Sequence, residues 1–232
     1  QRLDNQVLAP GVMFLEMALA AGNLVQRRPG ITSIPVVVWL KPLLISDKPV
    51  DLYVSLYVKN KGTETIRFEV SSGGLDDAAK QVYAKGHLTF AARSATAKVE
   101  QEAIDIDAVR SRCTTTWSGE QCYEKFRQIG MQYGPLFQPI QILHRNPLEA
   151  LAQLRLPVSA ATDWTLNASL VDGALQTTLG LRPDTSDGVT YLPYALGMLE
   201  PFATLGDQVY VYATRSHSPD PETIRFNLSI CD

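Results

Sequence analysis

Cysteine and histidine are both scarce in this chain, which has three of each among its 232 residues. An odd number of cysteines does not suggest a disulfide framework, and it favours a reduced, cytosolic setting. No two cysteines have the spacing of a metal-ligand pair and the histidines stand alone, so we expect no structural zinc. The residues concerned are Cys113, Cys122 and Cys231, with His87, His144 and His217.

Charge of one sign and long hydrophobic runs are lacking as well. The formal net charge is -3, so the chain has no basic excess of the kind that binds nucleic acid. The most apolar run, residues 10–25, contains Glu16 and is too short to span a bilayer. We therefore expect neither a nucleic acid nor a membrane as a partner. Because residues 224–230 read as a strand with no closing element after it, we also expect the chain to be part of a larger polypeptide.

The first part of the chain contains one apolar helix followed by strands. Pro10 and Gly11 suit a helix start, and residues 12–20 are apolar on nearly every face, which is typical of a buried helix. Strand-like patterns then follow at residues 34–45, 50–58, 65–70 and 81–90. One buried helix with several antiparallel strands predicts an α+β unit in which the sheet wraps around the helix.

The same order of elements returns in the second part. The intervening alanine-rich stretch has no strand period and is interpreted as a linker. A short helix is predicted at residues 119–129 and a second buried helix at 166–181. Strands are predicted at residues 137–143, 150–156, 191–199, 208–214 and 224–230. Two buried helices, each wrapped by a sheet, predict a double hotdog: residues 1–92 form the first unit, 93–110 the linker and 111–232 the second unit.

Four segments carry a family resemblance. Residues 1–11 (QRLDNQVLAPG) align without gaps to the pattern HxxxGxxxxPG, and residues 130–138 (GMQYGPLFQ) match GxxYGPxFQ almost letter for letter. Residues 167–176 (NASLVDGALQ) are similar to HPxxLDxxxQ, and residues 191–194 (YLPY) are close to LPF. On these segments the chain resembles the dehydratase domains of modular polyketide synthases, with residues 39–42 favouring bacterial synthases.

The resemblance implies a dehydration site with two titrating groups. In the family, a histidine removes the α-proton of a β-hydroxyacyl chain and an aspartate protonates the leaving hydroxyl. The acyl chain is carried on the phosphopantetheine arm of an acyl carrier protein, and the domain needs no cofactor of its own. Asp172 matches the acid, and Gln176 matches the residue expected to hold the leaving group. Pro10, Gly11 and Val12 match the helix start near the thioester carbonyl, where backbone N–H groups stabilise negative charge.

Gln1 stands where the family has its catalytic histidine. A carboxamide offers only hydrogen bonds and cannot serve as a base near pH 7. Asn5 replaces the family glycine, so two departures fall in one motif. We therefore expect a degenerate dehydratase-like domain, although Gln1 could equally be a frayed terminus or an engineered change. Tyr133 is either a packing residue beside the Gly-Pro turn or part of the substrate site.

Three functions remain open from the sequence. The first is a non-dehydrating domain that docks a carrier protein or shapes a chamber for its chain beside a ketosynthase, as in chain-branching modules. The second is an active lyase or isomerase that uses Asp172. The third is an interface element within a module that forms a homodimer. The histidine at position 87 is expected to be an ordinary strand residue, the other two to be solvated, and Met13, Phe14 and Met17 to lie in the core or line an acyl tunnel.

Overall fold

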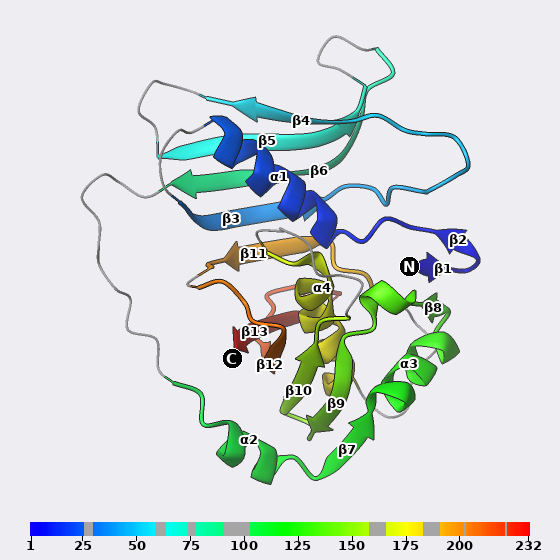
Figure 1. Cartoon of the computed structure of the whole chain (residues 1–232), viewed down its shortest axis with the longest axis vertical. Helices are drawn as coiled ribbons and strands as arrows, with labels where there is room; N and C mark the ends of the chain where they lie inside the picture. Colours follow the sequence, from blue (N-terminus) through cyan, green and yellow to red (C-terminus); the bar gives the residue numbers. More distant parts are fainter. Residues whose placement is uncertain are drawn as a thin grey trace. The chain divides into compact units, whose positions relative to one another are not determined.

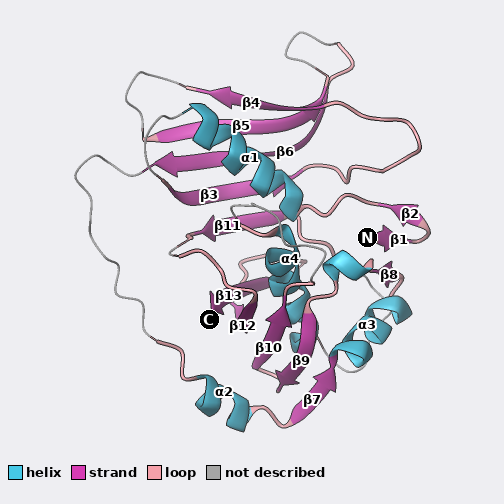
Figure 2. Ribbon diagram, viewed as in Figure 1, coloured by secondary structure: helices cyan, strands magenta, loops and turns pink. Residues whose placement is uncertain are grey.

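The computed structural model describes residues 1–25, 30–58, 64–73, 78–90, 103–157, 166–182, 191–201, 203–220 and 222–232. The chain divides into two compact units that are both discontinuous in sequence. One unit comprises Asn5–Val99 with Tyr191–Thr204, and the other comprises Gln1–Asp4, Glu100–Thr190 and Leu205–Asp232. Both pair a helix with an antiparallel sheet, as the sequence predicts (Figures 1 and 2).

The unit that contains residues 5–99 is built on helix α1 (Val12–Val25). Its sheet has the strand order β11-β3-β6-β5-β4, and every neighbouring pair is antiparallel. The strands are β3 (Ile31–Trp39), β4 (Leu52–Tyr57), β5 (Thr65–Ser72), β6 (Gln81–Phe90) and β11 (Ala195–Leu199), and the short strand β2 (Gln6–Val7) precedes the helix. Helix α1 lies across the face of this sheet (Figure 1), because its side chains are apolar almost all round and must be buried.

The start of α1 is held by a contact with strand β3. Trp39 Nε1 donates a hydrogen bond to the carbonyl oxygen of Gly11 at 2.9 Å. A Cβ atom at Gly11 would lie 2.9 Å from Trp39 Nε1, so only glycine allows this approach. The helix then begins at Val12, and Met13 N and Phe14 N donate to Pro10 O and Gly11 O.

The other unit has a sheet with the strand order β13-β12-β10-β9-β7, again antiparallel throughout. Its strands are β7 (Thr115–Ser118), β9 (Ile140–Arg145), β10 (Glu149–Arg155), β12 (Gln208–Ser216) and β13 (Arg225–Cys231), and the short strand β1 (Arg2–Leu3) pairs with β8 (Met131–Gln132). Its helices are α2 (Ile106–Arg112), α3 (Gly119–Gln128) and α4 (Ala168–Gln176), with the 3₁₀ turns η1 (Pro135–Phe137) and η3 (Thr177–Leu181). Helices α3 and α4 bury Tyr123, Phe126 and Leu170 in one hydrophobic core.

Helix α2 is attached to this unit by a buried carboxylate. Arg112 donates two hydrogen bonds to Glu149, at 2.8 and 2.9 Å, and Tyr212 OH and Asn146 Nδ2 donate to the same group. These donors lower the pKa of Glu149 to about 2, and Arg112 makes the largest contribution. The carboxylate therefore stays charged and fixes the segment that follows the predicted linker.

Several element boundaries differ from the sequence prediction. Residues 106–110, assigned to the linker, form the start of α2 because Asp105 caps it by accepting from Ala108 N. Phe137 belongs to a 3₁₀ turn, and strand β9 begins only at Ile140, since proline at the first position of that turn favours helical φ. Residues 195–199, assigned to the second unit, pair with β3 of the first. The predicted boundary at residues 92–93 lies outside the described residues.

No helix in the described part of the chain is long and apolar enough to cross a membrane. Over the same residues, no three side chains of the His, Cys, Asp or Glu types gather in a way that could hold a metal ion.

Candidate active site

Asp172 lies in the middle of α4, a helix that is buried along most of its length. The helix begins after Asn167, whose side chain accepts a hydrogen bond from Leu170 N, and Ser169 Oγ donates to Leu136 O at 2.7 Å. These contacts tie the first turn of α4 to the segment that carries the Gly-Pro motif. Asp172 is only 6% exposed, so its carboxyl group is one of the few buried acids in the described chain.

Gln176 is the direct partner of Asp172. It lies one helical turn further on, and its Nε2 donates to Asp172 Oδ2 at 2.7 Å and to the carbonyl oxygen of Phe137 at 3.0 Å. The other carboxyl oxygen, Oδ1, accepts no hydrogen bond from the described residues. Because every buried side-chain polar atom in that part of the chain has a partner, Oδ1 must be the oxygen that remains accessible. Asp172 therefore offers one oxygen to a ligand.

Burial raises the pKa of Asp172 to about 6. The hydrogen bond from Gln176 opposes this shift, since it stabilises the charged form. A carboxyl group with such a pKa is protonated in about a tenth of the molecules at pH 7, far more than an aspartate with the usual pKa. It can then donate a proton, which an ordinary exposed aspartate does rarely.

Gln1 lies close enough to Asp172 for an electrostatic interaction. Burial lowers the pKa of its amino group, and Asp172 acts in the opposite direction. The position follows from the pairing of β1 with β8, in which Leu3 faces Met131, and from the hydrogen bond of Asp4 N to Gly130 O. The structure thus brings together Gln1 and Asp172, two site residues that are 171 positions apart in the sequence.

Two tyrosines complete the surroundings of Asp172. Tyr123, on α3, is 6% exposed, and its hydroxyl donates to Gln176 Oε1 at 3.1 Å and accepts from Ile140 N at 3.0 Å. The ring of Tyr133 packs edge-on against Phe126, with centroids 5.0 Å apart, and against Tyr123 at 6.1 Å. Burial, and secondarily Asp172, raise the pKa of Tyr133 well above its usual value, so Tyr133 is a packing residue whose hydroxyl stays neutral near the acid.

Tyr123 was not predicted as a site residue. The helical spacing of Cys122, Phe126 and Ile129 identifies the apolar face of α3, and Tyr123 extends that face with a polar tip. A buried tyrosine hydroxyl needs a hydrogen-bond partner. That need is the signal by which sequence reasoning could have singled it out.

Four predicted substrate-binding residues, Asn5, Pro10, Gly11 and Val12, belong to the unit of α1. Asn5 has φ 65°, the left-handed region that glycine adopts freely and asparagine tolerates best among the other residues. The replacement of the family glycine by asparagine therefore keeps the backbone conformation. The backbone angle therefore accounts for Asn5, and Gln1 is the remaining departure in that motif.

Two family profiles match this chain. A profile described as "Polyketide synthase dehydratase N-terminal domain" matches residues 101–232, and one described as "Polyketide synthase dehydratase domain" matches residues 1–73. The chain belongs to the polyketide synthase dehydratase family. The predicted α+β double hotdog is confirmed, because the similar solved structures are dehydratase domains of this fold.

Individual relatives agree with this assignment. Polyketide synthase PksN of Bacillus subtilis is 31% identical over the whole chain, which spans 4% of that protein's length. The crystal structure of a trans-AT polyketide synthase dehydratase domain from Brevibacillus brevis has a TM-score of 0.85 and 29% identity, with 100% of this chain and 82% of that one covered. Two inactive CurK dehydratase mutants, in which a histidine is replaced by phenylalanine or an aspartate by asparagine, have TM-scores of 0.79 and 0.81, 23% and 22% identity, and cover 100% of this chain and 79% and 80% of their own.

The histidines of the described chain have other surroundings than Asp172. His87 lies exposed on β6 opposite Arg67, and His217 lies exposed after β12. His144 lies half-buried near the end of β9, and its Nδ1 is 2.9 Å from Thr116 Oγ1. The side chain that bonds to the Asp172 carboxyl group is the amide of Gln176.

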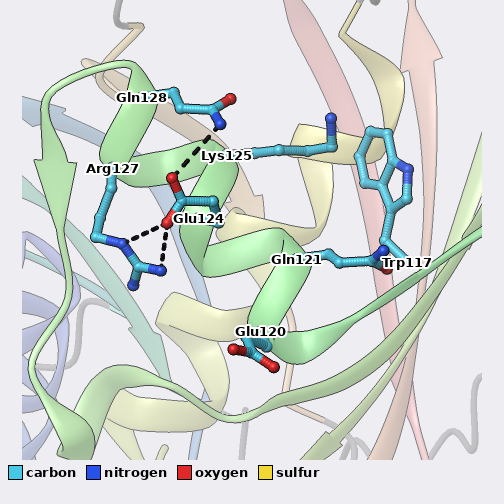
Figure 3. Close-up of a pocket in the computed structure, with 7 residues that line it drawn as sticks. All are labelled: Trp117, Glu120, Gln121, Glu124, Lys125, Arg127 and Gln128. Carbon is cyan, nitrogen blue, oxygen red and sulfur yellow. Dashed lines mark hydrogen bonds and ion pairs between the residues drawn. The ribbon is translucent and has the colours of Figure 1, made fainter.

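Two surface hollows of this unit adjoin α3, and Asp172 does not line either of them. One of about 440 Å³ is lined by side chains that already pair with one another (Figure 3): Arg127 and Gln128 bind Glu124, and Lys125 Nζ lies 4.4 Å from the centre of the Trp117 ring. The second, of about 530 Å³, adjoins the start of the same helix. Because neither hollow is lined by Asp172 or Gln176, we do not assign the dehydration chemistry to them.

Proposed function

We propose that this domain of a modular polyketide synthase holds a carrier-protein-bound acyl chain at Asp172 and Gln176 but does not dehydrate it. The single observation behind the proposal is that Gln1 stands at the family's histidine position, and its backbone nitrogen is within electrostatic range of the buried acid. The domain would then be a pseudoenzyme with respect to dehydration.

The chemistry at this site needs a base that Gln1 cannot supply. Removal of an α-proton requires a group whose pKa lies near the working pH, and the glutamine amide has none. Loss of a positioned base typically reduces the rate by about 10²–10⁴. The mutants of CurK dehydratase named inactive, one without a histidine and one without an aspartate, support the view that family members need both groups.

The remaining half of the site supports ligand binding. Asp172 presents one accessible oxygen, and Gln176 holds the other. A protonated carboxyl group can donate to a hydroxyl or carbonyl oxygen of an acyl chain without any further chemistry. The partners we propose are the acyl carrier protein, with its phosphopantetheine arm, and the ketosynthase of the same module. Supporting a ketosynthase in chain branching is the more specific form of this role.

An active lyase or isomerase is the second candidate. It is favoured by the intact Asp172–Gln176 pair and by the pKa of about 6, which suits a general acid. Such an enzyme would need a base from another residue, or a reaction in which Asp172 acts alone.

The decisive experiment restores the base. The intact protein that contains this chain, and its Gln1→His variant, are incubated with a β-hydroxyacyl carrier protein, and loss of water from the acyl chain is followed by mass spectrometry. We expect no dehydration by the unmodified protein and a gain of about 10² or more in Gln1→His. Gln1→Asn is the matched amide control, and adding Asp172→Asn to Gln1→His should abolish the gain.

Three outcomes would contradict the proposal. Dehydration by the unmodified protein would show that a base other than residue 1 is present, and double-bond migration in an enoyl carrier protein would favour the isomerase. A Gln1→His variant that binds the acyl carrier protein substrate yet gains no activity would show that Gln1 is not what prevents dehydration.

A further inference from the structure

The hydroxyl of Tyr123 both accepts and donates a hydrogen bond, and its neighbours determine which partner takes which role. Ile140 N–H can only donate, so the tyrosine oxygen accepts from it at 3.0 Å. The hydroxyl hydrogen is therefore free for one further acceptor, and the nearest is Gln176 Oε1 at 3.1 Å. Tyr123 thus acts on Gln176 as a donor of fixed direction.

The side-chain amide of Gln176 has a single consistent orientation as a result. Phe137 O is a carbonyl oxygen and can only accept, so it must face Nε2, which it does at 3.0 Å. Tyr123 holds Oε1 on the other side. The second hydrogen of Nε2 points at Asp172 Oδ2, 2.7 Å away. Both amide hydrogens and the amide oxygen are therefore engaged.

The consequence reaches the acid itself. Asp172 Oδ2 receives a hydrogen from Gln176 and has no acceptor among the described residues, so a proton on the carboxyl group belongs on Oδ1, the accessible oxygen. We propose that Tyr123 is a positioning residue, which through Gln176 keeps the proton of Asp172 on Oδ1 and presents it as a donor to an oxygen of the bound acyl chain. This inference rests on the proposed function for the identity of the ligand, an acyl thioester with a hydroxyl or carbonyl oxygen at the β-carbon.

We call the hydrogen bonds from Tyr123 to Gln176 and from Gln176 to Asp172 the relay. Other titratable groups around Asp172 do not replace it. The electrostatic effect of Asp172 on Tyr133 has no direction of the kind that a hydrogen bond imposes. Burial raises the pKa of both tyrosines, so neither ionises while Asp172 titrates. The hydrogen bonds from Tyr123 through Gln176 are the directional link to the carboxyl group.

The test is a titration of Asp172 in the 232-residue chain, with aspartate ¹³Cγ resonances followed by NMR and the signal assigned by its loss in Asp172→Asn. In Tyr123→Phe, Gln176 loses its anchor and its bond to Oδ2 weakens. We expect the midpoint of Asp172 to rise by roughly half a unit to one unit and the side-chain amide hydrogens of Gln176 to exchange faster with solvent. Gln176→Leu should raise the midpoint at least as much.

Tyr212→Phe is the matched control. Tyr212 lies in the same unit and also donates to a carboxylate, Glu149, at 2.9 Å, but it does not contact Gln176. It should leave the Asp172 midpoint unchanged, which separates the relay from a general loss of stability.

An unchanged midpoint in Tyr123→Phe, together with a raised one in Gln176→Leu, would overturn the inference. Should Tyr123→Phe fail to fold, measurements on the unmodified chain still test the inference. The side-chain amide hydrogens of Gln176 must exchange slowly with solvent, and their chemical shifts must change with the same midpoint as Asp172. No turnover enters this measurement. Dehydration by the unmodified protein would therefore overturn the proposed function without touching the relay.

Discussion

At the scale of single residues, the candidate site combines a buried acid, Asp172, with a glutamine at the position of the family's base. Asp172 is buried on an apolar helix, and one of its oxygens is held by Gln176. Gln1 contributes hydrogen-bonding capacity only. Under the proposed function, the identity of residue 1 decides whether the domain only binds a β-hydroxyacyl chain or dehydrates it.

The buried acid should make stability depend on pH. The pKa of Asp172 rises from 3.8 in the unfolded chain to about 6 in the folded one, so folding binds a proton between these values. Above about pH 6 the folded chain must carry a buried carboxylate, and stability is lower there. We compare the change in the free energy of unfolding that Asp172→Asn causes at pH 8 with the change that it causes at pH 3.5. The change at pH 8 should be more stabilising by about 3 kcal/mol.

Urea unfolding at the two pH values measures this difference, because any change in packing is common to both and cancels. Asp207→Asn, an exposed change in the same unit, is the control and should show no such dependence. An effect of Asp172→Asn that is equal at both pH values would contradict the burial of the acid.

At the scale of elements, close packing places α3, and with it Tyr123, against the sheet. Helix α3 begins with a capping box in which Ser118 and Gln121 exchange hydrogen bonds. The first helical residue, Gly119, lies so close to strand β9 that a Cβ atom there would collide with the carbonyl oxygen of Ile140. The same Ile140 supplies the N–H that orients Tyr123.

Gly119→Ala should consequently destabilise the chain. The added methyl group meets backbone atoms, which cannot move aside as a side chain can, and we expect a loss of about 1–3 kcal/mol in urea unfolding. Gly134→Ala is the matched control, since Gly134 has φ -75° and no atom within 4 Å of its would-be Cβ atom. Equal stability of the two variants would show that α3 is not in close contact with β9.

The elements themselves could largely be predicted from sequence. The apolar run after Pro10-Gly11 is α1, and the alternation of residues 81–90 is β6, because burial imposes periods of 3.6 and 2 directly on the side chains. Boundaries set by hydrogen bonds were less predictable. The strand predicted over residues 34–45 runs over Ile31–Trp39, and Leu40 N then bonds to Tyr83 O.

At the scale of the whole molecule, each of the two units is made of segments that are separated in the sequence by segments of the other. Strand β11 follows the second buried helix in sequence yet completes the sheet of the first unit, where Ala195 faces Val38 and Leu199 faces Ile34. Trp39 N also donates to Tyr194 O at 2.9 Å. The predicted division at residue 92 would therefore cut a sheet from one of its strands.

A fragment of residues 1–92 should fold poorly for this reason. Without β11, the backbone groups along the free edge of β3 are unpaired and invite association between chains. We expect the fragment to aggregate in size-exclusion chromatography, and a version with residues 191–204 fused through a flexible linker to be monomeric. A scrambled 191–204 segment is the control. A monomeric, cooperatively folding 1–92 fragment would contradict the assignment of β11.

The sequence by itself determined the family, the order of helices and strands, and the identity of the acid and its glutamine. Those features depend on side-chain type and on spacing along the chain, which a one-dimensional pattern retains. Only the tertiary structure decided that Gln1 lies beside Asp172, that Tyr123 orients Gln176, and that Asn5 merely preserves a left-handed backbone. These depend on contacts between segments far apart in sequence and on backbone angles, and both come into being only when the chain folds.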